Sequence, residues 1–178
     1  QNRIQLEHIV QNMGRQTLHL APWALSVMCS GGVAVFPHNL ERPQLLLPTH
    51  SISLWGYTQM NDPRWVWGKR YIMLHQDPAA TSAQKAGLQN PYGWAGYAVR
   101  NQLFIKRFAW DPSAVYPDLN CNFEAYTNAD ILELESLAPL QELRPGAVVS
   151  HREEWAVFDE IPTPRSEEDV DRTILPLV

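Results

Sequence analysis

Several features are scarce in this sequence of 178 residues, and each scarcity excludes a class of protein. Cysteine occurs only at Cys29 and Cys121, which is too few for a disulfide framework and lacks metal-type spacing. We therefore expect free thiols and a cytoplasmic, reducing location, with a single disulfide as the alternative. No apolar run approaches the length of a membrane span, and the first residues do not resemble a signal peptide.

Positive charge and ligand-type motifs are also scarce. The net charge of −5 and the isoelectric point near 5.6 argue against a partner with a nucleic-acid backbone, which would call for a basic surface. The six histidines include no paired spacing with a third ligand in reach, so we expect no metal. No glycine-rich phosphate loop or nucleophile elbow is present, and we expect no cofactor and no membrane partner.

Proline and tryptophan, by contrast, are abundant. The 14 prolines are spread along the whole chain, which disfavours long helices and is common in loops and at strand ends. The 7 tryptophans fit either a thick β core or a surface that faces a sugar, because flat aromatic rings stack on the C–H faces of pyranoses.

Alternating apolar residues predict many short strands. The stretch "RIQLEHIV" places Ile4, Leu6 and His8 on one face, and "GWAGYAVRNQLFIKRFAW" reads as a hairpin that turns near Asn101. The other expected strands lie within residues 17–29 (interrupted at Pro22), 33–37, 51–57, 69–75, 121–127, 131–139 and 147–158. Residues 58–68, 76–93, 111–120 and 140–146 read as connections, and only the tail after Ser166 predicts a helix.

Such closely spaced strands predict an all-β fold, an antiparallel β-sandwich with a short C-terminal helix. We see no internal repeat, low-complexity tract or linker, so residues 1–178 are expected to form one domain.

The stretch "DILELESL" places two glutamates in an apolar run. In a strand, Glu133 and Glu135 share one face, about 7 Å apart, while Leu132 and Leu134 share the other. The two glutamates form either the hydrated outer face of the sheet or the floor of a site that uses a carboxylate.

Three groups of motifs resemble the galactose mutarotase-like (aldose 1-epimerase-like) superfamily, in an uncharacterised bacterial branch. They are "NRIQLEHIVQNMGRQTLHLAPWALSVM", then "PRWVWGKRYIML", "KAGLQNPYGWAGY" and "LFIKRF", and finally "LELESLAPLQELRPGAVVSHREEWAVF". The resemblance covers the C-terminal part of that fold and implies a supersandwich that lacks the N-terminal strands. Because a truncated sandwich leaves an edge or face uncovered, we expect a homodimer.

The resemblance implies a chemistry for Glu135. In this family a glutamate on the matching strand acts as the base on a sugar hemiacetal during mutarotation. The catalytic histidine of the family is replaced here by Trp23, which cannot donate a proton to the ring oxygen. His19, His50 and His75 are nearby alternatives, and their spacing selects none of them.

We predict that other residues bind the substrate around this base. They are Trp23, Trp67, Lys85, Trp94, Lys106, Glu124, Tyr126 and Glu133. Lys106 lies between Phe104 and Phe108 on an apolar face, so it needs an anionic partner, for which Glu135 and Glu124 are the candidates.

Three functions follow from these patterns. The first is a sugar mutarotase or epimerase-like isomerase with Glu135 as base. The second is a non-catalytic sandwich that binds a small sugar or an acidic metabolite in the same cleft. The third is an interaction protein that dimerises through an exposed sheet. The replacement of the histidine by Trp23 favours the second and third.

Overall fold

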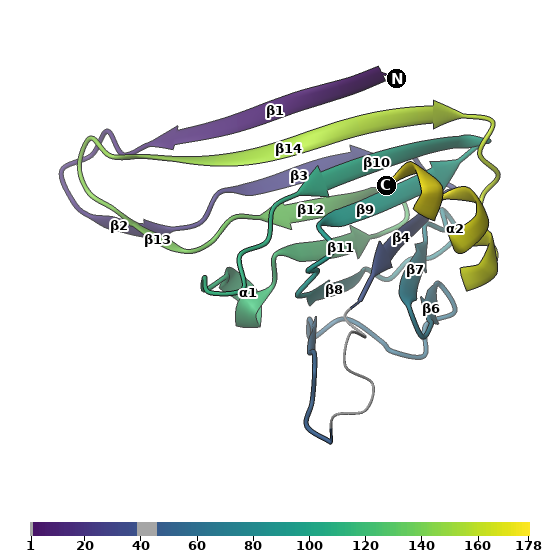
Figure 1. The fold of residues 1–178 in the computed structure, drawn as a ribbon. Helices are drawn as coiled ribbons and strands as arrows, with labels where there is room; N and C mark the ends of the chain where they lie inside the picture. Colours follow the sequence, from purple (N-terminus) through teal and green to yellow (C-terminus); the bar gives the residue numbers. More distant parts are fainter. Residues whose placement is uncertain (1, 39–45) are drawn as a thin grey trace.

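Two antiparallel sheets face each other in the computed structural model, which describes residues 2–38 and 46–178 (Figure 1). The larger sheet has the order β1 (Asn2–Gln11), β14 (Val148–Asp159), β10 (Gln102–Phe108), β9 (Trp94–Val99), β4 (Val33–Pro37), β7 (Tyr71–His75), β6 (Trp65–Trp67). The smaller has the order β3 (Trp23–Met28), β12 (Leu132–Leu137), β11 (Phe123–Thr127), β8 (Gln84–Leu88), β5 (Ile52–Leu54). The prediction of an all-β antiparallel sandwich is confirmed.

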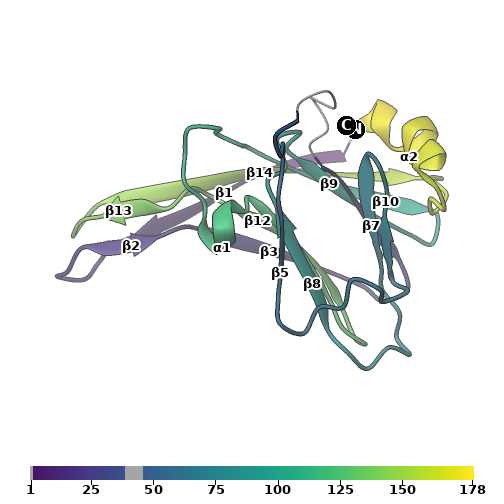
Figure 2. The same cartoon turned by 90° about the horizontal axis from the view of Figure 1, so that it is seen from below.

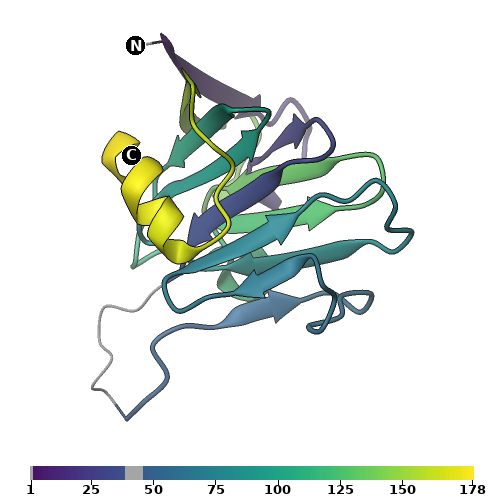
Figure 3. The same ribbon diagram turned by 90° about the vertical axis from the view of Figure 1, so that its right-hand side faces the viewer.

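The apolar core has two parts, one on each face of the seven-stranded sheet. Between the two sheets, side chains such as Phe36, Phe123 and Leu134 are fully buried. On the other face, Ile105 and Val170 belong to a second cluster beneath the C-terminal segment. That segment contains α2 (Glu167–Thr173) and η1 (Leu175–Leu177), which lie against the larger sheet in Figure 3.

The short C-terminal helix begins where the sequence predicts. The Ser166 hydroxyl accepts a hydrogen bond from the Asp169 backbone N–H at 3.3 Å, and three acidic residues occupy the first turn. Both features stabilise a helix N-terminus.

A small arm extends beyond the sandwich. It is the two-stranded sheet of β2 (Leu18–Leu20) and β13 (Gln141–Leu143), which projects from one end of the molecule in Figure 2. The segment α1 (Pro117–Asn120) is a single turn with positive φ at Asp118, Leu119 and Asn120.

Most of the expected strands are present. The elements that were not expected lie in segments predicted to be connections. The 93–110 hairpin forms as predicted, with Arg100 and Asn101 at positive φ in its turn. The predictions that residues 58–68, 76–93 and 140–146 are connections are wrong in part, because these residues contain β6, β8 and β13. Residues 111–120 likewise contain α1.

Strand β8 was not predicted because its sequence lacks the pattern of a strand. Its sequence "QKAGL" has no alternation of apolar and polar residues, yet all five residues are buried. Within the described residues, Cys29 and Cys121 are free thiols, and Cys121 is buried. The described part of the chain also contains no helix that is long and apolar enough to cross a membrane.

Candidate functional site

The candidate site lies on the face of the five-stranded sheet that points away from the core. Leu132 and Leu134 pack between the sheets, so the alternate residues Glu133 and Glu135 point outward, as predicted. Strand register places Glu135 opposite Glu124 of β11. The neighbouring strand β8 then contributes Lys85 to the same face.

Glu135 is buried and is held by two donors. Its Oε2 accepts a hydrogen bond from Lys85 Nζ at 2.8 Å and another from Trp23 Nε1 at 2.9 Å. Its Oε1 is buried and has no hydrogen-bond partner within the described residues. One oxygen therefore anchors two neighbouring side chains while the other keeps an unused acceptor.

Lys85 sits between two carboxylates and two indoles. Its Nζ lies 2.7 Å from Glu124 Oε2 and 2.8 Å from Glu135 Oε2. The same atom lies 4.9 Å from the ring centroid of Trp23 and 4.7 Å from that of Trp55, which is cation–π geometry. Burial alone would lower the pKa of Lys85, but the hydrogen bonds to the two glutamates outweigh burial, and the pKa is raised.

Glu124 shares the single lysine with Glu135. The pKa of Glu124 is raised from an ordinary 4.5 to about 8, mainly by burial and also by the nearby Glu135, against the opposing effect of Lys85. One ammonium cannot balance two buried carboxylates, so Glu124 largely retains its proton at neutral pH.

More aromatic and acidic side chains border this cluster. Tyr126 pairs in register with both Lys85 and Glu133, and its ring meets that of Tyr57 edge-on, with centroids 6.5 Å apart. Burial raises the pKa of Glu133, and Glu135 raises it further. We call Trp23, Trp55, Lys85, Glu124 and Glu135 the lysine cluster, and Tyr57, Tyr126 and Glu133 its border.

The structure therefore brings together six of the predicted site residues on one sheet face. They are Trp23, Lys85, Glu124, Tyr126, Glu133 and Glu135. Sequence reasoning missed Trp55 and Tyr57 as site residues, although both belong to the aromatic stretch "SISLWGY", which was itself a predicted strand.

The other predicted site residues lie elsewhere. Trp67 is on β6, stacks on Trp65 with centroids 4.7 Å apart, and donates its N–H to the backbone oxygen of Met60. Trp94 is buried in the cluster beneath the C-terminal segment, near Tyr71. Trp94 lines a separate cavity of about 350 Å³, so the single cleft expected to hold Trp67 and Trp94 beside Lys85 is not formed.

Lys106 does not belong to the site where it was expected. It lies on the same face as Phe108, as predicted, but it is completely buried between the sheets. Its Nζ lies 2.7 Å from Glu153 Oε1, so the expected partners Glu135 and Glu124 are wrong. It also donates to the backbone oxygens of Ala24 and Leu134. Lys106 is thus part of an internal ion pair and not of the sheet face.

Glu153 holds the rest of this internal network together. It accepts hydrogen bonds from the hydroxyl of Ser136, from His8 Nε2 at 3.2 Å and from Trp155 Nε1 at 3.1 Å. Burial would raise the pKa of Glu153, but Lys106, Ser136 and His8 lower it overall. Sequence reasoning did not identify Glu153, because alternation gives the face of a residue and not the strand across from it.

No histidine within the described residues contacts Glu135. His19 is on β2 in the projecting arm, His50 lies against His38 and His75 ends β7. The groups that donate hydrogen bonds to Glu135 are the Trp23 indole and the Lys85 ammonium. An indole does not release its N–H proton. Within the described residues there is also no group of histidine, cysteine and acidic side chains that could hold a metal ion.

Comparisons with known proteins give fold similarity only. No family model matches the sequence. No curated protein sequence matches it significantly. Among solved structures, the Slr1438 protein from Synechocystis sp. PCC 6803 is similar at 15% identity with a TM-score of 0.49. An Escherichia coli K12 protein named "putative aldose 1-epimerase" is similar at 17% identity with a TM-score of 0.46.

The similarity to both structures is partial. It covers 89% and 88% of this chain but only 51% and 56% of theirs, so the chain spans about half the length of each. Both similarities are therefore partial and stand at low sequence identity.

Proposed function

We propose that the outer face of the five-stranded sheet binds a carbohydrate, with Trp23 as the surface on which a pyranose ring stacks. The main support for this proposal is that the Trp23 ring is exposed to solvent and at the same time held in place. It is 51% exposed, yet its N–H is bonded to the buried Glu135 and Lys85 lies against its ring. An aromatic ring that is both exposed and fixed binds a flat ligand with little loss of side-chain freedom.

Polar groups around Trp23 suit a ligand rich in hydroxyl groups. Glu133, Tyr57 and Tyr126 border the lysine cluster and supply a carboxyl group and two phenols. Sugar sites typically combine an aromatic surface with a few such hydrogen-bonding groups that fix orientation.

Binding fits the geometry better than epimerisation does. A base must lie within about 2.6–3.2 Å of the proton that it removes. Glu135 has no exposed surface, and its Oε2 already accepts from Lys85 and Trp23. The described residues also place no histidine opposite it. We therefore propose that Glu135 positions the Trp23 ring and does not act on the sugar.

The binding test is a calorimetric or NMR titration of the whole chain with a panel of monosaccharides and oligosaccharides. We expect saturable binding of at least one sugar and a loss of about 5- to 150-fold in Trp23→Ala, because the stacking of a flat nucleic-acid base on an aromatic ring is worth about 1–3 kcal/mol by alanine substitution. Trp23→Phe keeps a ring and should retain part of the affinity. Trp67→Phe, on the other sheet, is the matched control and should bind as the native chain does.

An assay of anomer interconversion separates binding from catalysis. We expect the native chain and Glu135→Gln to leave the background rate of every aldose unchanged. If the native chain accelerates interconversion and Glu135→Gln abolishes the effect, the non-catalytic proposal is wrong. A panel with no saturable binding at all would remove the carbohydrate proposal itself.

We also propose that the chain dimerises through β1, because one specific feature favours it. β1 is the terminal strand of the seven-stranded sheet and pairs with β14 over its whole length, which leaves its other edge without a partner in the described chain. A long unpaired edge strand is a template for pairing with another chain.

The residues of β1 are complementary to a second copy of the same strand. Antiparallel pairing about Gln5 places Arg3 opposite Glu7 of the second copy, and Ile4 opposite its Leu6. Glu7 already pairs with Arg152 within the chain, so this arrangement continues an alternating row of charges across the interface.

Light scattering after size exclusion tests the dimer. We expect a dimer mass for the native chain and a monomer for Gln5→Lys, because the two new lysines would stand directly opposite each other. Gln16→Lys adds the same charge in the turn after β1 and should stay dimeric. A monomeric native chain would refute this proposal without affecting the carbohydrate site.

A further inference from the structure

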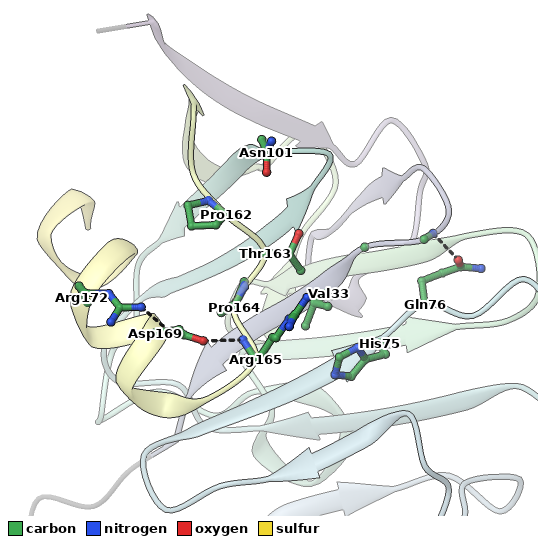
Figure 4. Close-up of a pocket in the computed structure, with 12 residues that line it drawn as sticks. Val33, His75, Gln76, Asn101, Pro162, Thr163, Pro164, Arg165, Asp169 and Arg172 are labelled. Carbon is green, nitrogen blue, oxygen red and sulfur yellow. Dashed lines mark hydrogen bonds and ion pairs between the residues drawn. The ribbon is translucent and has the colours of Figure 1, made fainter.

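Another cavity lies at one end of the sandwich, and none of its lining residues belongs to the lysine cluster or its border. It has a volume of about 610 Å³, which is enough for a small metabolite. Its walls come from the turn before β4 at Gly31 and Gly32, from the end of β7 at His75, and from the segment that leads into α2 (Figure 4).

One wall of this cavity is fixed by hydrogen bonds. Gln76 accepts from the Gly31 backbone N–H at 2.6 Å and donates to the backbone oxygens of Asn128 and Ala129. The Tyr97 hydroxyl accepts from the Gly32 backbone N–H at 2.9 Å. Because these groups already have partners, the wall is formed before any ligand arrives.

The charges that line the cavity are unbalanced. Asp169 is its acidic residue, and both of its oxygens are occupied, one by the Arg172 side chain at 2.6 Å and one by the Arg165 backbone N–H at 3.0 Å. Within residues 2–38 and 46–178, the Arg165 guanidinium has no carboxylate partner and the His75 ring has no hydrogen-bond partner. In Figure 4 both side chains project toward the space beside Val33.

We propose that this cavity binds a small oxyanion, the phosphate or carboxylate group of a metabolite, with the Arg165 guanidinium as its main contact. A guanidinium presents paired N–H donors that match two oxygens of a phosphate or carboxylate. His75 and the Thr163 hydroxyl line the same cavity and complete the set of donors.

The state of His75 agrees with this assignment. It is half-buried, and burial lowers its pKa, so the ring is largely neutral at pH 7 and offers one N–H. The charged groups that line the cavity with it are Arg165, Arg172 and Asp169. A bound anion would add the negative charge that the ring lacks and would raise its pKa.

Two-dimensional ¹H–¹⁵N NMR of the full chain tests the proposal. The probes are inorganic phosphate and acetate, titrated separately at constant ionic strength, with chloride as the reference salt. We expect saturable shifts of the Gly31, Gly32 and Val33 amides with at least one probe, and the responding probe identifies the phosphate or carboxylate class. A change confined to His75 ring signals would count as well.

Two arginine variants make the test specific. Arg165→Gln should weaken binding about tenfold or more, because a hydrogen bond to a charged group is worth about 1.5–3 kcal/mol. Arg144→Gln removes the same charge from an exposed arginine beside Glu142 and should leave the affinity unchanged. Shifts that do not saturate, that chloride reproduces, or that both variants weaken equally would overturn the proposal.

Discussion

Replacing Glu124 by glutamine should make the protein more stable in alkali while leaving its stability in acid nearly unchanged. The pKa of this buried carboxyl group is raised from 4.5 to about 8, mainly by burial. The folded chain therefore holds this proton more tightly than the unfolded chain does. The stability linked to it is fully present below about pH 4.5 and is lost as the pH rises through 8.

The size of this loss follows from the two pKa values. Each tenfold change in the acid dissociation constant corresponds to about 1.4 kcal/mol. The shift from 4.5 to about 8 therefore limits the loss of stability at pH 9 to about 5 kcal/mol. Water that reaches the sheet face once the group ionises reduces this cost, so we expect about 2–4 kcal/mol. Glutamine keeps the shape of the side chain and does not ionise.

Urea unfolding followed by tryptophan fluorescence at pH 4.5, 7 and 9 measures the effect. We expect Glu124→Gln to match the native chain within about 1 kcal/mol at pH 4.5 and to exceed its free energy of unfolding by about 2–4 kcal/mol at pH 9. Glu142→Gln, at an exposed acid in the projecting arm, should show no such pH-dependent difference. If Glu124→Gln is less stable than the native chain by the same amount at every pH, the reasoning is refuted, because Glu124 would then be an ionised member of the cluster throughout.

Two further substitutions test the packing on either side of the smaller sheet. Gly87→Ala should lower the free energy of unfolding by about 1–3 kcal/mol in urea, since a Cβ there would lie 2.8 Å from the Cys121 sulfur, whereas Gly56→Ala meets nothing within 4 Å and should change little. Lys106→Ala should lower it by about 3–5 kcal/mol because it leaves Glu153 buried without its cation, and a loss below 1 kcal/mol would show that this ion pair does not matter for stability.

Local patterns in the sequence were enough to predict the strands that alternate cleanly. Leu132 and Leu134 against Glu133 and Glu135 gave the correct faces of β12, since the side-chain period of a strand is two residues. The helix after Ser166 was equally predictable, because its N-cap and acidic first turn are local features.

The partners across strands were not predictable in the same way. Lys85 meets Glu135 only because β8, β11 and β12 are neighbours in that order, and a single sequence does not specify strand order. Likewise the face of Lys106 was predicted correctly, but its partner Glu153 comes from a strand that pairs with β10 from far along the chain. The candidate site was therefore predicted as a set of residue types rather than as a set of contacts.

The pairing of β1 with β14 has a consequence for how the protein folds. His8 of β1 and Glu153 of β14 are separated by 145 positions, and β14 is also the strand that joins β1 to the rest of its sheet. Contacts between such distant segments carry a large loop-closure cost, which slows folding. Within the described residues β1 pairs only with β14, so during synthesis this pairing forms after β14 has left the ribosome. We therefore expect the amide protons of β1 to gain protection last in refolding, together with those of β14.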